Sequence, residues 1–182
     1  MIIKDTHLDG VRIIIPNRKS EDHRGYFFES FKSKFFEENN LPIFFHQENQ
    51  VRSKKNVIRG MHYQLNNPQG KLVRTIEGSI FDVAVDIRIG SPKFGQYVMV
   101  ELSSNNNKML YIPEGFAHGY LVKSDQSLVV YKCTNLYDPK DEYSLLWNDK
   151  DIGIKWNCNA PILSSKDKVA PRLKDQKFLP TL

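Results

Sequence analysis

A strict two-residue alternation between Ile80 and Ile89 is the feature of this sequence that most constrains its fold. Apolar side chains recur at every second position from residue 81 to residue 89, and Asp82, Asp86 and Arg88 lie between them. A period of two residues is that of a β-strand with one apolar face and one polar face. We therefore expect a half-buried strand here.

Nine further short runs of similar character occur along the chain, separated by turn residues such as glycine, proline, serine and asparagine. They are 10–16, 25–29, 44–49, 57–64, 71–76, 96–102, 110–113, 119–123 and 128–134. About ten short strands in one chain are typical of a β-sandwich or barrel. The fold class is therefore predicted to be all-β.

Helices are expected to be few. Phe31, Phe35 and Glu38 have helical spacing, which predicts a helix over 33–39, and a second short helix is expected near 149–153. After Lys166 the pattern weakens, and Pro171 and Pro180 argue against regular structure at the end of the chain.

Composition sets the class of protein. The 182 residues are 40% hydrophobic and 26% charged, which is typical of a globular protein, and one domain over 1–182 is expected. No apolar stretch reaches the roughly 18 residues needed to span a bilayer, and Asp5 falls where a secretory signal would be apolar. The two cysteines, Cys133 and Cys158, are too few for a disulfide framework, so we expect a cytoplasmic protein. The formal charge of +5 is scattered, which suits a small anionic ligand as well as nucleic acid.

The segment 57–64 and the run that follows it carry residue types used in acid–base chemistry. Arg59 and His62 are three positions apart, so strict alternation would point them to opposite faces, and a shared site needs a bulge, for which Gly60 is the obvious place. Lys71 begins a strand that could pair with the one carrying His62. An ammonium group beside an imidazole suits proton removal with an oxyanion forming nearby. An exposed arginine and a core histidine would explain the first segment equally well.

Three later segments add candidates. His118 lies just after a turn, Tyr131 has the parity of the interior positions of its predicted strand, and Lys166 and Asp167 form a polar cluster behind an apolar pair. Each also has a purely structural explanation: a hydrogen-bonded turn histidine, a core tyrosine with its hydroxyl satisfied, and a solvated tail.

Together these segments resemble the dTDP-4-dehydrorhamnose 3,5-epimerase family over almost the whole chain. The shared motifs are Asp-x-Arg-Gly-x-Phe-x-Glu at 22–29, Gln-Glu-Asn at 47–49, Arg-Gly-Met-His-Tyr-Gln at 59–64, Gly-Lys-Leu-Val-Arg at 70–74, Gly-Phe-Ala-His-Gly at 115–119, and the segment 131–142. The resemblance implies a cupin-like jelly-roll β-sandwich or barrel with a few short peripheral helices.

The resemblance also implies a reaction. The family inverts C3 and C5 of dTDP-4-dehydro-6-deoxy-D-glucose, giving dTDP-4-dehydro-L-rhamnose, because the C4 carbonyl acidifies both neighbouring C–H groups and an enolate forms. By similarity, His62 is the base and Asp167 orients and polarises its ring. Tyr131 is the acid on the other face of the sugar, and Lys71 stabilises the developing oxyanion.

Further residues correspond to substrate contacts in the family. Arg24 and Arg59 match phosphate-binding residues, Tyr137 matches the aromatic that stacks on thymine, and His118 matches a second polar contact. Other matching binding positions are Phe27, Glu29, Gln47, Asn49, Glu142 and Lys166. Members of the family are homodimers that exchange N-terminal strands, so Arg24 and Glu29 would serve the partner's ligand.

The expected partner is a dTDP-linked 4-keto-6-deoxy sugar, not nucleic acid or a membrane. No cofactor or metal is expected, because a neighbouring cation can stabilise the enolate. Metal-binding cupins also use a His-x-His pair, whereas Tyr63 and Gln64 follow His62. Three alternatives stay open: an epimerase that inverts only C5 or only C3, a non-catalytic nucleotide-sugar-binding cupin, and a metal-dependent cupin.

Overall fold

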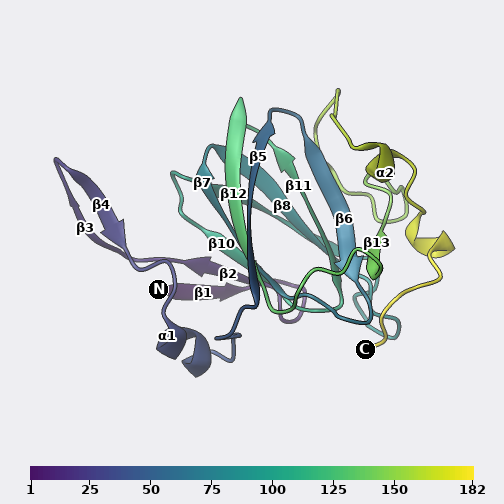
Figure 1. Ribbon diagram of the computed structural model, residues 1–182, viewed down its shortest axis with the longest axis horizontal. Coiled ribbons are helices and arrows are strands. Elements are labelled where there is room, and N and C mark those ends of the chain that lie inside the picture. Colours follow the sequence, from purple (N-terminus) through teal and green to yellow (C-terminus); the bar gives the residue numbers. More distant parts are fainter.

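Two antiparallel β-sheets face each other in the computed structural model, which describes residues 1–182 apart from the side chains of residues 18 and 19 (Figure 1). The six-stranded sheet has the order β1 (Ile2–Asp5), β2 (Arg12–Ile15), β10 (Met109–Ile112), β7 (Lys71–Glu77), β12 (Gln126–Cys133), β5 (Gln47–Lys54). The five-stranded sheet has the order β13 (Glu142–Ser144), β6 (Ile58–Gln64), β11 (Phe116–Val122), β8 (Ser79–Asp86), β9 (Tyr97–Ser103). The expected all-β sandwich is confirmed, and the chain crosses repeatedly between the sheets, as in a jelly roll.

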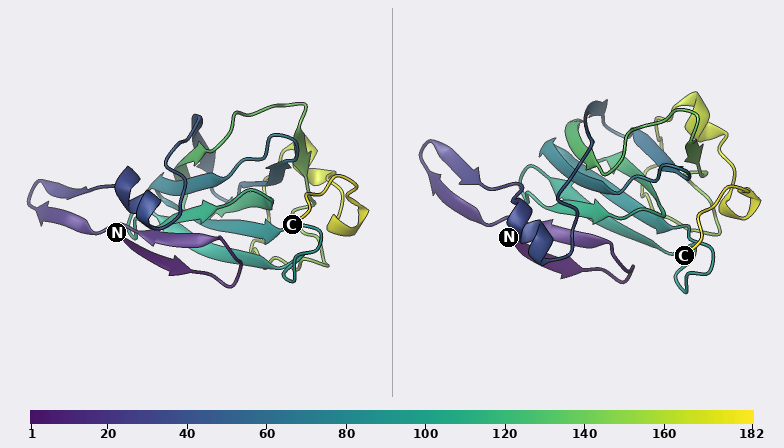
Figure 2. Two further views of the ribbon diagram at one scale, coloured as in Figure 1. Left: turned by 90° about the horizontal axis from the view of Figure 1, so that it is seen from below. Right: turned by 60° about the horizontal axis from the view of Figure 1, so that its bottom comes forward.

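A third sheet contains only β3 (Arg18–Asp22) and β4 (Gly25–Phe28), which form a hairpin that projects from the sandwich (Figures 1 and 2). The helix α1 (Ser33–Glu38) follows it and buries Phe36 in a cluster with Leu72 and Met109 of the six-stranded sheet. The C-terminal segment carries the short helices α2 (Ser165–Lys168) and η1 (Leu173–Asp175). No helix in the part of the chain that the structure describes has the length and apolar character needed to cross a membrane.

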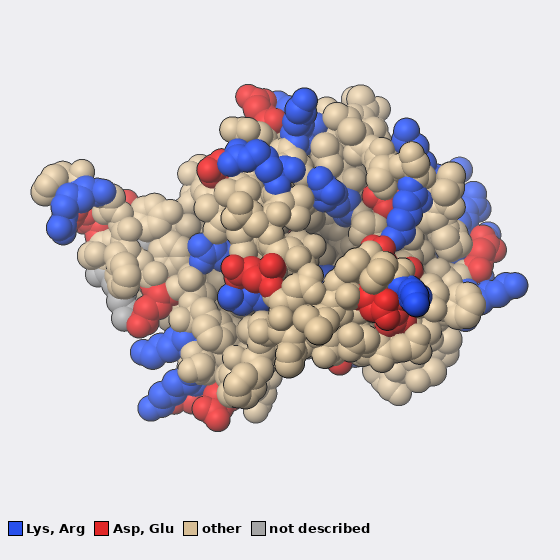
Figure 3. All heavy atoms as spheres, viewed as in Figure 1, with Lys and Arg blue, Asp and Glu red and all other residues tan. Residues whose placement is uncertain are grey.

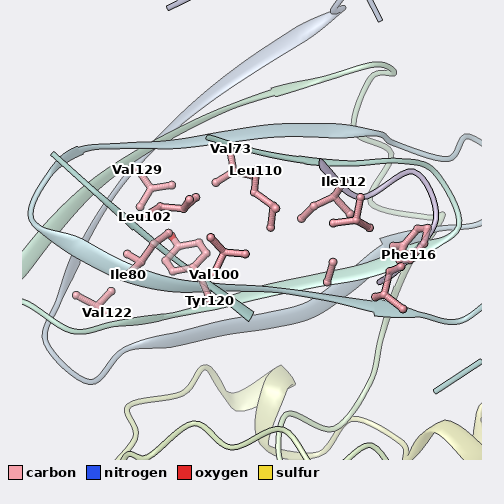
Figure 4. Close-up of a cluster of buried hydrophobic side chains, with 13 residues drawn as sticks. Val73, Ile80, Val100, Leu102, Leu110, Ile112, Phe116, Tyr120, Val122 and Val129 are labelled. Atoms are coloured by element: carbon pink, nitrogen blue, oxygen red, sulfur yellow. The ribbon is translucent and has the colours of Figure 1, made fainter. Parts of the chain in front are cut away.

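The space between the sheets holds an apolar cluster (Figure 4). Val73 and Val129 of the six-stranded sheet meet Ile80 and Tyr120 of the five-stranded sheet there. Burial of this surface removes apolar area from water and is the main stabilising contribution to the sandwich.

The C-terminal segment covers the outer face of the five-stranded sheet, where Val83 and Val85 of β8 lie in one cluster with Ile152 and Trp156. Both faces of β8 are therefore buried, and Asp82 is fully buried. The expectation of a half-buried strand was wrong, because the face that carries Asp82 also carries Ile80 and Ala84 and packs toward the six-stranded sheet, which the alternation along β8 does not reveal.

Each predicted run overlaps a strand, and α1 confirms the first predicted helix. The second prediction, a helix near 149–153, was wrong. The chain turns there around the buried Asp149 carboxylate, which accepts hydrogen bonds from the backbone N–H groups of Asp151 and Leu173. The end of the chain is also more regular than expected. Ser164 starts α2 by accepting a hydrogen bond from the Asp167 N–H, a serine N-cap.

Candidate active site

A pocket of about 530 Å³ lies between the two sheets, with walls from β5, β7 and β12 on one side and β6 and β11 on the other. In Figure 3 the surface is hollowed between β5 and β6, and lysine and arginine side chains lie beside the hollow. The lining residues are Gln47, Glu48, Asn49, Gln50, Val51, Arg59, His62, Tyr63, Gln64, Gln69, Lys71, His118, Tyr120, Tyr131, Tyr137, Glu142, Ser164 and Asp167.

Arg59 and His62 both line this pocket because β6 bulges between them. His62 is paired with His118 on β11 and Arg59 with Tyr120, so three steps along β6 match two steps along β11. Gly60 lies in this bulge with φ +116°, a backbone conformation that residues with side chains rarely adopt. The bulge predicted at Gly60 is confirmed.

Lys71 reaches the same pocket by a different route from the one expected. Its strand, β7, pairs with β10 and β12, whereas β6 lies in the opposite sheet. The expectation that the strands of Lys71 and His62 pair was therefore wrong. The two side chains line one pocket because the two sheets face each other.

His62 and Asp167 are 105 residues apart in sequence and form a hydrogen bond of 2.7 Å between Nε2 and Oδ1. The Asp167 side chain is almost fully buried. Burial opposes its ionisation, but hydrogen bonds from His62, Ser164 and the Gly60 backbone outweigh that effect and lower the pKa of Asp167. An ionised carboxylate only accepts hydrogen bonds, so Nε2 of His62 is the donor in this bond and Nδ1 is the ring nitrogen that can accept a proton.

Glu142 connects the mouth of the pocket to His62. Its Oε1 is 3.9 Å from His62 Nδ1, its Oε2 accepts a hydrogen bond of 2.9 Å from the Tyr137 hydroxyl, and it forms an ion pair with Lys166. Burial opposes ionisation of Glu142, but Lys166, Tyr137 and His62 together lower its pKa. The carboxylate therefore stays ionised beside the imidazole.

The wall opposite His62 carries Lys71 and Tyr131. Lys71 is 7% exposed, and burial lowers the pKa of its ammonium group, although Cys133, Glu142 and Asp82 act in the opposite direction. Burial raises the pKa of Tyr131, so its phenol is protonated at neutral pH. The pocket thus has a proton acceptor on one wall and a cation and a proton donor on the other.

His118 has a carboxylate partner of its own, the fully buried Asp82, with Nε2 2.7 Å from Oδ1. Burial raises the pKa of Asp82, although His118 and Lys71 act against this effect. The ring of His118 meets that of Tyr131 edge-on, with 6.3 Å between their centroids. The Asp82 contact fixes the His118 ring in the pocket.

Polar side chains near the rim are held by hydrogen bonds. Arg59 Nε donates to Ser53 Oγ at 3.0 Å. Gln47 donates to Asn49 at 2.9 Å and accepts from the backbone N–H of Tyr137 at 2.8 Å. These contacts position groups that can bind a nucleotide or its phosphates.

Four of the residues predicted for the site do not line this pocket. Lys166 forms an ion pair with the lining residue Glu142. Arg24, Phe27 and Glu29 come from the projecting β3–β4 hairpin or just after it, where Arg24 is bound to Asp22 and Phe27 is 58% exposed. Phe27 lines a separate pocket of about 250 Å³ at the base of the hairpin.

Sequence reasoning missed several lining residues. Gln64, Gln69 and Tyr120 lie inside the quoted motifs or next to them, but nothing in the sequence marked them as facing the pocket. Asp82 was assigned to a polar face, so its contact with His118 was not foreseen. Among the described residues, no group of three or more His, Cys, Asp or Glu side chains is arranged to hold a metal ion.

Comparisons with known proteins agree on one family. A family model described as dTDP-4-dehydrorhamnose 3,5-epimerase matches residues 5–175. A relative of that name from Salmonella typhimurium is 50% identical, with 98% of each chain covered. Another from Neisseria gonorrhoeae is 47% identical over all of this chain, which spans 58% of that relative's length.

Solved structures show the same sandwich. The dTDP-6-deoxy-D-glucose-3,5-epimerase of Legionella pneumophila, in complex with dTDP-4-keto-L-rhamnose, superposes with a TM-score of 0.95 at 44% identity, covering 100% of this chain and 98% of the other. A 3'-monoepimerase from Streptomyces bikiniensis, in complex with dTDP-quinovose, superposes with a TM-score of 0.90 at 33% identity, covering 97% and 91%.

Proposed function

Because this chain belongs to the dTDP-4-dehydrorhamnose 3,5-epimerase family, we propose that it inverts C3 and C5 of dTDP-4-dehydro-6-deoxy-D-glucose to give dTDP-4-dehydro-L-rhamnose. One observation carries the proposal: the His62–Asp167 pair, Lys71 and Tyr131 line one pocket although they come from four separate elements. A binding protein would have no need of a hydrogen-bonded imidazole opposite a buried cation and a phenol.

The first step is removal of a C–H proton by Nδ1 of His62. The electron pair of that C–H bond moves into the enolate and the negative charge develops on the C4 oxygen. Asp167 holds the ring through Nε2 and stabilises the imidazolium that results. Glu142, 3.9 Å from Nδ1, adds a second negative charge beside it.

The opposite wall completes the inversion. Lys71 stabilises the charge on the C4 oxygen, which is larger in the transition state than in the ketone. Tyr131 then donates its phenolic proton to carbon from the other face, which inverts the centre. Each inversion leaves His62 protonated and Tyr131 ionised, and exchange with solvent restores both. This chemistry requires neither metal nor cofactor.

Nucleotide binding is proposed at the rim. Tyr137 is about half exposed and its hydroxyl is held by Glu142, so its ring is available to stack on thymine. Arg59 binds the diphosphate, with Gln47, Asn49 and His118 as further polar contacts. Lys166 acts through its ion pair with Glu142.

Isotope exchange tests the reaction. In heavy water the sugar should gain deuterium at both C3 and C5, because each carbon is reprotonated by a group in exchange with solvent. In Tyr131→Phe, epimerisation should fall much more than exchange, since proton removal does not need the phenol. The absence of any exchange in the parent protein would contradict the proposed function and favour a binding protein.

An epimerase that inverts one centre is the second candidate, favoured by the structural match to a 3'-monoepimerase. It would use the same base and acid. Label at only one carbon of the product would identify it.

We also propose a homodimer in the cytoplasm. The β3–β4 hairpin projects from its own sandwich, with Tyr26 49% and Phe27 58% exposed, as expected of a segment that reaches a partner. In such a dimer Arg24, Phe27 and Glu29 complete the partner's site. Both cysteines are free thiols, which supports a reducing compartment.

A further inference from the structure

Tyr120 is a polar group of the pocket that the proposed reaction leaves without a role. Its side chain lines the pocket and is only 3% exposed. Within the described part of the chain, no group meets hydrogen-bond distance and angle with its hydroxyl, although Ser53 lies near enough to influence its pKa. Buried hydroxyls without partners are rare in folded proteins, and they mark places where a ligand or a water completes the bonding.

The position of Tyr120 indicates which kind of ligand its hydroxyl would bind. On β11 it is paired directly with Arg59 of β6. Arg59 uses Nε to bind Ser53, and it forms no ion pair with a carboxylate of the described residues. Its terminal nitrogens are therefore available to an anion, and a guanidinium next to a hydroxyl donor is a set that suits a phosphate oxygen.

The other strand neighbour of Tyr120 is an acid, Asp82 on β8. The Asp82 Oδ1 is bound to His118, and burial raises the pKa of this carboxyl group. Burial also raises the pKa of Tyr120 to about 12, although Arg59 and Ser53 act in the opposite direction. The phenol is thus protonated at neutral pH and can donate a hydrogen bond to an anionic oxygen.

We propose that the Tyr120 hydroxyl donates a hydrogen bond to a diphosphate oxygen of the bound nucleotide sugar, beside the Arg59 guanidinium. This inference rests on the proposed function, since it takes the nucleotide sugar as the ligand. Tyr120 acts on the position and affinity of the phosphates, not on proton transfer.

The test compares Tyr120→Phe with Tyr111→Phe, a control tyrosine that is 8% exposed and lies in the cluster on the outer face of the six-stranded sheet. Calorimetry measures binding of dTDP and of thymidine, which lacks the phosphates. Tyr120→Phe should weaken dTDP binding by roughly tenfold or more, the size expected for a hydrogen bond to a charged group, and leave thymidine binding unchanged. The control should bind both ligands like the parent.

Chemical denaturation without ligand measures the free energy of unfolding, which would fall in Tyr120→Phe if the hydroxyl had a structural role. Removing an unpartnered hydroxyl should leave the free energy of unfolding of Tyr120→Phe unchanged or raise it. Lower stability with unchanged dTDP affinity would overturn the proposal and assign the hydroxyl to a buried water. Unchanged dTDP affinity with a raised KM for the keto sugar would also overturn it, in favour of a sugar contact. A parent protein that binds dTDP without exchanging substrate protons would contradict the proposed function alone.

Discussion

At the scale of single residues, the proposed mechanism has Asp167 act on the reaction through its hydrogen bond with His62. Its carboxylate fixes which ring nitrogen carries the proton, so replacing it with an amide removes both the charge and the tautomer preference. Asp167→Asn should lower kcat by about 10²–10⁴-fold, the range for loss of an oriented general base. Steady-state kinetics with the keto sugar measures this.

Asp175→Asn is the matched control, because Asp175 lies in the same C-terminal segment and is exposed. It should behave like the parent. A kcat for Asp167→Asn within a few-fold of the parent would mean that another group orients the base.

At the scale of elements, the bulge in β6 brings Arg59 and His62 to one pocket, and it depends on Gly60. A methyl group there would lie 2.5 Å from Gly119 Cα and 2.6 Å from the His118 carbonyl oxygen, on a backbone with φ +116°. Gly60→Ala should therefore lose more than about 2 kcal/mol of stability, from strain and overpacking together, and should lose activity as His62 is displaced. Thermal unfolding and the exchange assay measure the two effects.

Gly90→Ala separates the two contributions to that loss. Gly90 has φ +91°, but a methyl group added there meets nothing within 4 Å. This variant should carry only the strain, about 1 kcal/mol, and should retain activity. Equal losses in both variants would show that contact with β11 is unimportant.

A second element, the loop at 65–67 beside the pocket, is organised by one carboxylate. Asp141 accepts hydrogen bonds from the backbone N–H groups of Leu65, Asn66 and Asn67. Burial raises the pKa of Asp141, but these bonds outweigh that effect and hold it below its usual 3.8. Since the folded pKa is depressed, the stabilisation is present above pH 3.8 and is lost as the pH falls through the folded value.

Asp141→Asn should accordingly cost about 1–3 kcal/mol at pH 7, the cost of a buried hydrogen-bonding set left incomplete. The difference from the parent should shrink as the pH falls below 3.8. Urea unfolding at pH 7 and pH 3 tests this. Asp125→Asn, whose side chain is 95% exposed in a pair with Lys55, should change stability by less than about 0.5 kcal/mol at both pH values. A loss of equal size at both pH values for Asp141→Asn would contradict the account.

These elements also show what the sequence could reveal. Alternation found most strands because it reports the buried face of a strand directly. It could not reveal that the face of β8 with Asp82 packs toward the six-stranded sheet, because the packing of two sheets leaves no pattern in one strand, and so Asp82 was assigned to a polar face. Strict alternation would have separated Arg59 and His62, and the glycine between them indicated where a bulge could bring them to one site. Only the family resemblance connected His62 with Asp167, because a contact across 105 residues leaves no local pattern.

At the scale of the whole molecule, the proposed homodimer would complete the site of each chain with residues of its partner. The hairpin that carries Arg24 extends away from the sandwich, and Arg24 does not line the pocket that contains His62. If two chains exchange hairpins, each site combines His62 of one chain with Arg24 of the partner. In each such site, Arg24→Ala would then remove the contribution of one chain and His62→Ala the contribution of the other.

Mixing these two variants tests that arrangement. After joint refolding, a heterodimer holds one site with both changes and one with neither, so activity should rise well above that of either variant alone, toward a quarter of the parent's if subunits pair at random. That figure follows because half of the dimers are then mixed and one of their two sites is intact. If Arg24 served the site of its own chain, both heterodimer sites would stay damaged and mixing would restore nothing. His62→Ala mixed with Asp167→Ala is the control: both residues come from one chain's pocket, and no recovery is expected.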